Sequence, residues 1–175
     1  MKLSTLLFSA VLATAMVAGA AAAELKPGDP APAFSMQGSD GKMHTLADYK
    51  GKKAVVIAWF PKAFTGGCTK ECKSMRADGD ALRKFDVAYF TASCDTPDKN
   101  KAFAESLELD YPILSDPTHD NATAFGVLGP KGNAQRWTFY IDKDGKIAEI
   151  DKKVKTETHG QDIAGKLKEL GVAQK

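Results

Sequence analysis

The residues best suited to chemistry lie in the stretch PKAFTGGCTKEC, which runs from Pro61 to Cys72. It follows the apolar run AVVIAWF and contains two of the three cysteines of the chain, Cys68 and Cys72, four positions apart. A cysteine thiolate is both a nucleophile and a soft metal ligand. The spacing is therefore compatible with redox chemistry at sulfur or with metal binding, and the surrounding residues have to distinguish the two.

The position of Cys68 favours a reactive thiol. A buried strand is predicted for AVVIAWF, because a continuous apolar run of this length is typical of a strand covered on both faces. Pro61 ends that strand, and a helix capped by the side chain of Thr65 is expected to continue to Lys84. Cys68 then lies in the first helical turn, where unpaired N–H groups and the helix dipole stabilise a thiolate.

Two glycines, Gly66 and Gly67, stand directly before Cys68. They would let the backbone approach a ligand closely, without side chains in the way. A cysteine that merely packs in a core needs none of these neighbours, so that interpretation is less favourable than a nucleophile.

The elements that must position these residues predict one α/β domain. Strands are expected twice within 34–46 around a turn, and at 86–93, 111–114, 136–142 and 146–150; helices are expected at 96–109, 118–125 and 158–170. Strands alternating with helices indicate a central mixed sheet with helices on both faces. Ligands bind at the carboxyl ends of strands in open sheets of this kind, which is where the quoted stretch lies.

Composition fits one globular domain and excludes several classes of protein. The chain has 175 residues, 43% of them hydrophobic, and 24 basic against 22 acidic residues, without the basic stripe that nucleic-acid binding needs. Residues 1–23 hold an apolar run ending in small residues, which predicts a cleaved signal peptide, with an uncleaved membrane anchor as the alternative. Residues 24–175 would then form an exported domain, periplasmic or secreted, free of the membrane after cleavage. An odd number of cysteines in such a domain favours reactive over structural thiols.

The motif residues resemble those of a known family. Pro61, Thr65 and Cys68 match the P-x-x-x-T-x-x-C motif of the peroxiredoxins, and WFPKAFTGGCTKE is similar to the active-site segment of their thiol-peroxidase branches, including the bacterioferritin comigratory (PrxQ) type. The segments LKPGDPAPAF, SDGKMHTLADYKGK, TASCDTPDKNKAFAE, YPILSDPT and RWTFYIDKDGKI extend the resemblance over nearly the whole mature chain.

The resemblance implies a thioredoxin-like fold over residues 24–175 and a cofactor-free enzyme. Its substrates would be hydrogen peroxide and organic hydroperoxides, its reductant thioredoxin-like or another thiol, and its state a monomer or a homodimer. Cys68 would be the peroxidatic cysteine, which becomes a sulfenic acid, with Thr65 and Pro61 as pocket residues and Arg136 as the active-site arginine. The backbone N–H groups of Gly67 and Cys68 would be further donors to the peroxide.

The resolving thiol departs from the family pattern. The comigratory branch usually has it five positions after the peroxidatic cysteine, where this chain has Lys73, whereas Cys72 lies four positions after it. We expect Cys72 to resolve the sulfenic acid as a disulfide, although helical neighbours four apart hold their Cβ atoms about 5–6 Å from each other and a disulfide needs roughly 3.8 Å. The first turn would have to unwind. A packing role for Cys72 and resolution by Cys94 or an external thiol stay open, although Cys94 is interpreted as a packed or partly buried thiol.

Two other functions share the C-x-x-x-C spacing or the fold. Exported copper chaperones with a thioredoxin-like domain bind metal through two cysteines and a histidine, but the corresponding positions here are Gln135 and Arg136, and a cation opposes a metal. A disulfide reductase would be expected to carry C-x-x-C. The histidines, His44, His119 and His159, have no ligand spacing and are interpreted as surface or capping residues, so neither a metal nor another cofactor is expected.

Overall fold

The computed structural model describes residues 24–175, and the predicted signal peptide, residues 1–23, lies outside the described residues. In chain order the elements are β1 Ser35–Gly38, β2 Met43–Thr45, α1 Leu46–Tyr49, β3 Ala54–Trp59, α2 Gly66–Ala77, α3 Gly79–Arg83, β4 Val87–Ser93, α4 Pro97–Ser106, β5 Ile113–Ser115, α5 Asp120–Ala124, β6 Thr138–Ile141, β7 Ile147–Asp151 and α6 His159–Glu169. The strands form one seven-stranded sheet in the order β2-β1-β5-β4-β3-β6-β7.

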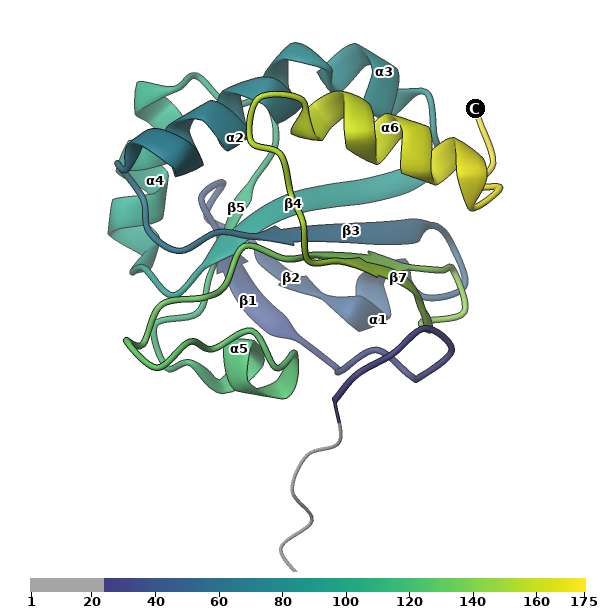
Figure 1. Ribbon diagram of the computed structural model, residues 1–175, viewed down its shortest axis with the longest axis horizontal. Helices are drawn as coiled ribbons and strands as arrows, with labels where there is room; N and C mark the ends of the chain where they lie inside the picture. Colours follow the sequence, from purple (N-terminus) through teal and green to yellow (C-terminus); the bar gives the residue numbers. More distant parts are fainter. Residues whose placement is uncertain (1–23) are drawn as a thin grey trace, which may run out of the picture.

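The sheet is mixed and covered on both faces, as the sequence predicts. Strand β3 pairs in parallel with β4 and antiparallel with β6, and β4 pairs in parallel with β5. Figure 1 shows α2, α3 and α6 along one face of the sheet and α5 against the other. Every residue of β3 is buried, because this central strand has a core on each side.

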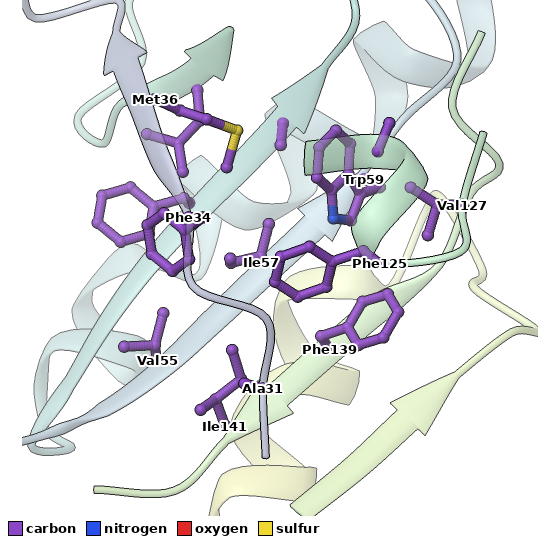
Figure 2. Packing of buried hydrophobic residues seen from close by; sticks show 14 of the residues in the cluster. Ala31, Phe34, Met36, Val55, Ile57, Trp59, Phe125, Val127, Phe139 and Ile141 are labelled. Carbon is purple, nitrogen blue, oxygen red and sulfur yellow. The ribbon is translucent and has the colours of Figure 1, made fainter. Parts of the chain in front are cut away.

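Alternate residues of β3 point into two different cores. Val55, Ile57 and Trp59 pack on the face that α5 covers, where Figure 2 shows Trp59 beside Phe125 and Phe139. Val56 and Ala58, between them in sequence, pack with residues of α2, α3 and α6 on the opposite face. The strand is thereby fixed on both sides, and its carboxyl end is a rigid base for the segment that follows.

Two predicted elements close to Cys68 and Arg136 differ from the structure, and one helix was not predicted. The helix expected from Thr65 to Lys84 is divided into α2 and α3 at Asp78, and Gly79 is buried so closely that a Cβ there would lie 2.8 Å from Asp110 Oδ2. Strand β6 begins at Thr138, so Arg136 precedes the strand and does not open it. Helix α1 is an element that the sequence pattern did not predict, although Thr45 and Asp48 form the capping box that starts it.

No helix within residues 24–175 has the length and apolar character needed to cross a membrane.

Candidate active site

The reactive stretch begins where β3 ends. The Phe60 N–H still donates to Ala92 O at 2.8 Å, but Pro61 has no N–H with which to continue the ladder. After a short loop, α2 begins at Gly66, and Cys68 is the third helical residue. The sequence therefore placed Cys68 correctly in the first turn. This residue is only 1% exposed, so its side chain is shielded from bulk water.

Antiparallel pairing of β3 with β6 brings Arg136 to this thiol. Ala58 lies opposite Thr138, and the Trp59 N–H donates to Trp137 O at 2.8 Å, so the residues just before β6 lie beside the end of β3. Arg136 Nη2 donates to Cys68 Sγ over 3.3 Å. A fixed cation thus faces the sulfur that the sequence singled out, and it favours the thiolate.

The two glycines before Cys68 differ in what they do. A Cβ at Gly67 would lie 3.2 Å from Arg136 Nη2, tight enough to push on the guanidinium, whereas a Cβ at Gly66 would meet nothing within 4 Å. These distances do not test the expectation that the two glycines let a ligand approach the backbone, which stays a prediction. Gly67 makes room for the arginine.

Thr65 is the N-cap residue of α2, but its side chain does not cap the helix. Its hydroxyl instead donates to Lys62 O at 2.9 Å, so the expected capping bond is wrong. With that proton engaged, the oxygen of the exposed Thr65 side chain is left as an acceptor. Within residues 24–175 no hydrogen bond engages the N–H groups of Gly67 or Cys68, which stay available as donors.

The loop between β3 and α2 is hydrogen-bonded to Asp95, which follows the end of β4. The Ala63 N–H donates to Asp95 Oδ2 at 2.7 Å, and Lys99 pairs with the other oxygen of this carboxylate. Phe64, which follows, adopts a left-handed φ of 63°, and its ring lies 4.9 Å from that of Phe103. The chain reverses here at a cost in backbone energy and enters α2 in a fixed direction.

A buried polar cluster lies behind the thiol. Glu71, which is 0% exposed, pairs through Oε2 with Arg136 Nη1, and its Oε1 lies 3.1 Å from His159 Nδ1. His159 is 1% exposed, and its Nε2 is hydrogen-bonded to Thr138 Oγ1 at 2.9 Å. The interpretation of His159 as a surface or capping residue is therefore wrong. Burial lowers the pKa of His159 to about 4, since a charged imidazole would lose its hydration there.

The other two cysteines are poor nucleophiles where they stand. Cys72 is 0% exposed, and burial raises its pKa to about 12. Cys94 is partly buried, as expected, and burial raises its pKa to about 11. Cys68 and Cys72 share one apolar cluster with residues of α4, while Cys94 packs against the core on the opposite face of the sheet.

Comparison with known proteins decides the family. Residues 27–150 match the model of the AhpC/TSA family. Peroxiredoxin Bcp of Escherichia coli K12 is 38% identical over 152 residues, which cover 83% of this chain and 97% of the relative. A putative peroxiredoxin of Mycobacterium tuberculosis, MT2597, is 38% identical over 145 residues, covering 77% and 90%.

The chain is a peroxiredoxin of the AhpC/TSA family. Peroxiredoxins are thiol peroxidases, so the chain is an enzyme of that class. Its fold agrees with solved structures: peroxidoxin BcpB of M. tuberculosis superposes with a TM-score of 0.76 at 29% identity, covering 83% of this chain and 97% of that one. A cysteine-to-serine mutant of Xylella fastidiosa PrxQ gives 0.78 at 22% identity, covering 84% and 98%, which supports the thioredoxin-like peroxiredoxin fold alone.

Sequence reasoning named the residues that the structure brings together around Cys68 and missed the buried residues behind them. The structure brings Arg136 and Gly67 against Cys68 and puts Thr65 at the start of the same helix. The sequence reasoning missed Glu71, although an acidic residue three positions after a first-turn cysteine faces the same side of the helix. Nothing in the sequence pattern indicates that a lone histidine 88 positions further along the chain than Glu71 is buried against it.

Proposed function

We propose that this peroxiredoxin reduces hydrogen peroxide and organic hydroperoxides at Cys68. The observation that carries the proposal is the 3.3 Å contact from Arg136 Nη2 to Cys68 Sγ at the amino end of α2. A cation and two free backbone donors there stabilise both the attacking thiolate and the charge that develops on the peroxide. Pro61, half-buried at the end of β3, shields the sulfur without competing for hydrogen bonds.

In the first step the Cys68 thiolate attacks the terminal oxygen of R–O–OH. The S–O bond forms as the O–O bond breaks, the RO⁻ group takes a proton and leaves as ROH, and Cys68 becomes a sulfenic acid. Arg136 and the N–H groups of Gly67 and Cys68 are donors toward the two oxygens, and the Thr65 oxygen accepts the hydrogen of the peroxide. The peroxide supplies the oxidising equivalents, so the step needs no cofactor.

In the second step Cys72 resolves the sulfenic acid. Its sulfur attacks Cys68 Sγ, the S–S bond forms, and the hydroxyl oxygen leaves as water with the thiol proton. Cys72 is 0% exposed, and helical spacing holds its Cβ too far from that of Cys68 for a disulfide, so α2 must open before Cys72 reacts. Burial also raises the pKa of this thiol to about 12. The Tyr111 hydroxyl, which donates to Cys72 O at 3.0 Å, is released in that opening. A thioredoxin-like dithiol or another thiol then reduces the disulfide.

Cys94 is the less suitable resolver. It packs on the face of the sheet away from Cys68, so a bond between the two sulfurs would require the loop after β4 to leave its core. Copper handling through Cys68 and Cys72 is disfavoured by the Arg136 cation beside the sulfur.

The apolar run within residues 1–23 supports export to the periplasm or secretion, with the domain of residues 24–175 active after cleavage, as a monomer or a homodimer. Sequencing the amino terminus of the protein purified from the cell envelope tests this. A first residue of Glu24 is expected, and a retained Met1 would contradict cleavage.

Peptide mapping after one equivalent of hydrogen peroxide tests the chemistry. The wild type should give a Cys68–Cys72 disulfide, and the C68S variant should not consume peroxide. The C72S variant should consume the first equivalent and then stop at the sulfenic acid, or proceed to sulfinic acid in excess peroxide. A Cys68–Cys94 disulfide would transfer the resolving role, a persistent sulfenic acid in the wild type would indicate an external thiol, and full activity of C68S would refute the proposal.

A further inference from the structure

Four polar side chains form a line that ends at the reactive sulfur. Thr138 at the start of β6 bonds His159 at the start of α6, His159 lies against Glu71 of α2, and Glu71 pairs with Arg136, which contacts Cys68. The first three are buried. Buried polar groups cost free energy unless they are paired, so a line of this kind in a core requires an explanation.

The protonation states in this line are fixed by its chemistry. Glu71 and Arg136 form an ion pair without net charge, so a charged imidazole beside it would add an unpaired buried cation. Asp151 and Asp162 would attract that cation, but burial and the charge of Arg136 oppose it. His159 is therefore neutral, with one N–H. A carboxylate only accepts, so Nδ1 carries the hydrogen toward Glu71 Oε1, and Nε2 accepts from the Thr138 hydroxyl.

The Nδ1 and Oε1 atoms depend on each other. They lie 3.1 Å apart, and neither has a properly aligned hydrogen-bond partner within residues 24–175. A hydrogen bond between them would satisfy both atoms. Helix α6 is fixed to α2 right beside this contact, because the Gly160 N–H donates to Ser74 Oγ at 3.1 Å and a Cβ on Gly160 would lie 2.6 Å from Ser74 O. The distance from His159 to Glu71 is thus set by close packing of the two helices.

We propose that His159 is a positioning residue for Cys68 that acts through Glu71 and Arg136. Its Nδ1–H occupies Glu71 Oε1, so the carboxylate takes only Nη1 of the guanidinium through Oε2. Nη2 is left free to donate to Cys68 Sγ. The inference rests on the proposed function only in taking Cys68 as the reactive sulfur.

Removing the imidazole donor should change how the carboxylate binds the arginine. Arginine and carboxylate groups prefer a bidentate pair with two parallel N–H···O bonds. Without the histidine, Glu71 Oε1 is free to turn toward Nη2 and draw it away from the sulfur. The Cys68 thiolate then loses its charged donor, although no atom that touches the sulfur has been mutated.

The test compares two polar variants that differ in where they offer an N–H. H159N places a donor near the position of Nδ1, and H159Q places one near Nε2. The pH dependence of Cys68 alkylation by iodoacetamide, followed by peptide mapping, reports the thiolate without any peroxide. H159Q and the apolar H159L should move the midpoint up by about one pH unit, which is about tenfold less thiolate below it, and H159N should keep it near the wild-type value. H44N is the matched control. His44 lies on β2, where its ring is hydrogen-bonded to Tyr49 and Asp40, so this variant should leave the alkylation midpoint of Cys68 unchanged.

Two results would overturn the inference. One is an equal midpoint in folded H159N and H159Q, which compare directly even if H159L does not fold. The other is a midpoint that H159Q still raises by the full amount in the E71Q variant, which lacks the carboxylate through which the effect should act. If the wild-type protein has no peroxidase activity, the proposed function is refuted. The pH profiles of Cys68 alkylation would still decide the role of His159.

Discussion

Arg136 has two roles that a single substitution would confuse. It donates to Cys68 Sγ, and it neutralises Glu71, which has no access to water. The R136A variant loses the sulfur donor and also leaves a buried carboxylate without its partner. The double variant R136A/E71Q loses the same donor and leaves a neutral amide in place of the carboxylate. Comparing the two separates catalysis from stability.

The magnitudes follow from burial. Removing one partner of a buried ion pair costs about 3–5 kcal/mol, and the Arg136 side chain is 23% exposed, so we expect the free energy of unfolding of R136A to fall by about 3 kcal/mol. Removing one charge-assisted donor from a site of developing charge slows the reaction by about 10²–10³. R136A/E71Q should recover most of the lost stability and none of the lost rate.

Urea unfolding measures the first quantity, and the second-order rate of peroxide consumption in stopped flow, under conditions in which both variants are folded, measures the second. The wild type and the single E71Q variant are the references. If R136A/E71Q regains both stability and rate, Arg136 acts only by holding the fold together, and the reasoning from its contact with Cys68 is refuted.

Three further results are expected. G67A should react with peroxide at least about tenfold more slowly, because its Cβ displaces the arginine, while G66A, with open space at its Cβ, should keep the wild-type rate; equal rates in stopped flow would contradict this. Y111F, which removes a bond of about 1 kcal/mol to the Cys72 carbonyl, should form the disulfide about fivefold faster in rapid-quench mapping, and an unchanged rate would mean that α2 opens elsewhere. Burial lowers the pKa of His159 from 6.5 in the unfolded chain to about 4 in the folded protein, so the folded state loses stability when the pH falls below 6.5. The free energy of unfolding should be steady above pH 6.5 and fall by about 3 kcal/mol as the pH drops to 4, as measured by urea unfolding at each pH. If the stability of H159N falls with pH in the same way, other groups cause the loss.

The place of Cys68 in the fold was predictable because its signals are local. The order of an apolar strand, Pro61, Thr65 and Cys68 fixes a strand, a loop and a helical first turn within a dozen positions. Each feature limits the backbone of its neighbours, so no distant contact is needed to place the thiol. The turn at DKDG between β6 and β7 has an equally local cause, because Gly145 adopts the positive φ that glycine tolerates.

The supporting residues were not predictable because their roles depend on tertiary contacts. His159 begins a helix, a position that in most proteins faces water, and it is buried only because Gly160 lets α6 lie against α2. The break between α2 and α3 has a similar cause: Gly79 packs against the side chains of Arg83 and Asp110. Local periodicity carries no information about such approaches between segments far apart in the sequence.

The position of Glu71 links the two steps of the proposed cycle. It lies between Cys68 and Cys72 on α2, so a disulfide between these cysteines cannot form without moving the residue that holds Arg136. Unwinding the first turns therefore removes the sulfur donor, the backbone donors and the helix dipole together, at the moment when the sulfur no longer needs them. Reduction of the disulfide allows the helix to reform, Glu71 returns to His159, and Arg136 is again held for a new thiolate. On this reasoning the buried polar groups stabilise the fully folded, reduced form in particular. Oxidation should therefore speed the exchange of amide hydrogens at the interface between α2 and α6 more than it does in the sheet.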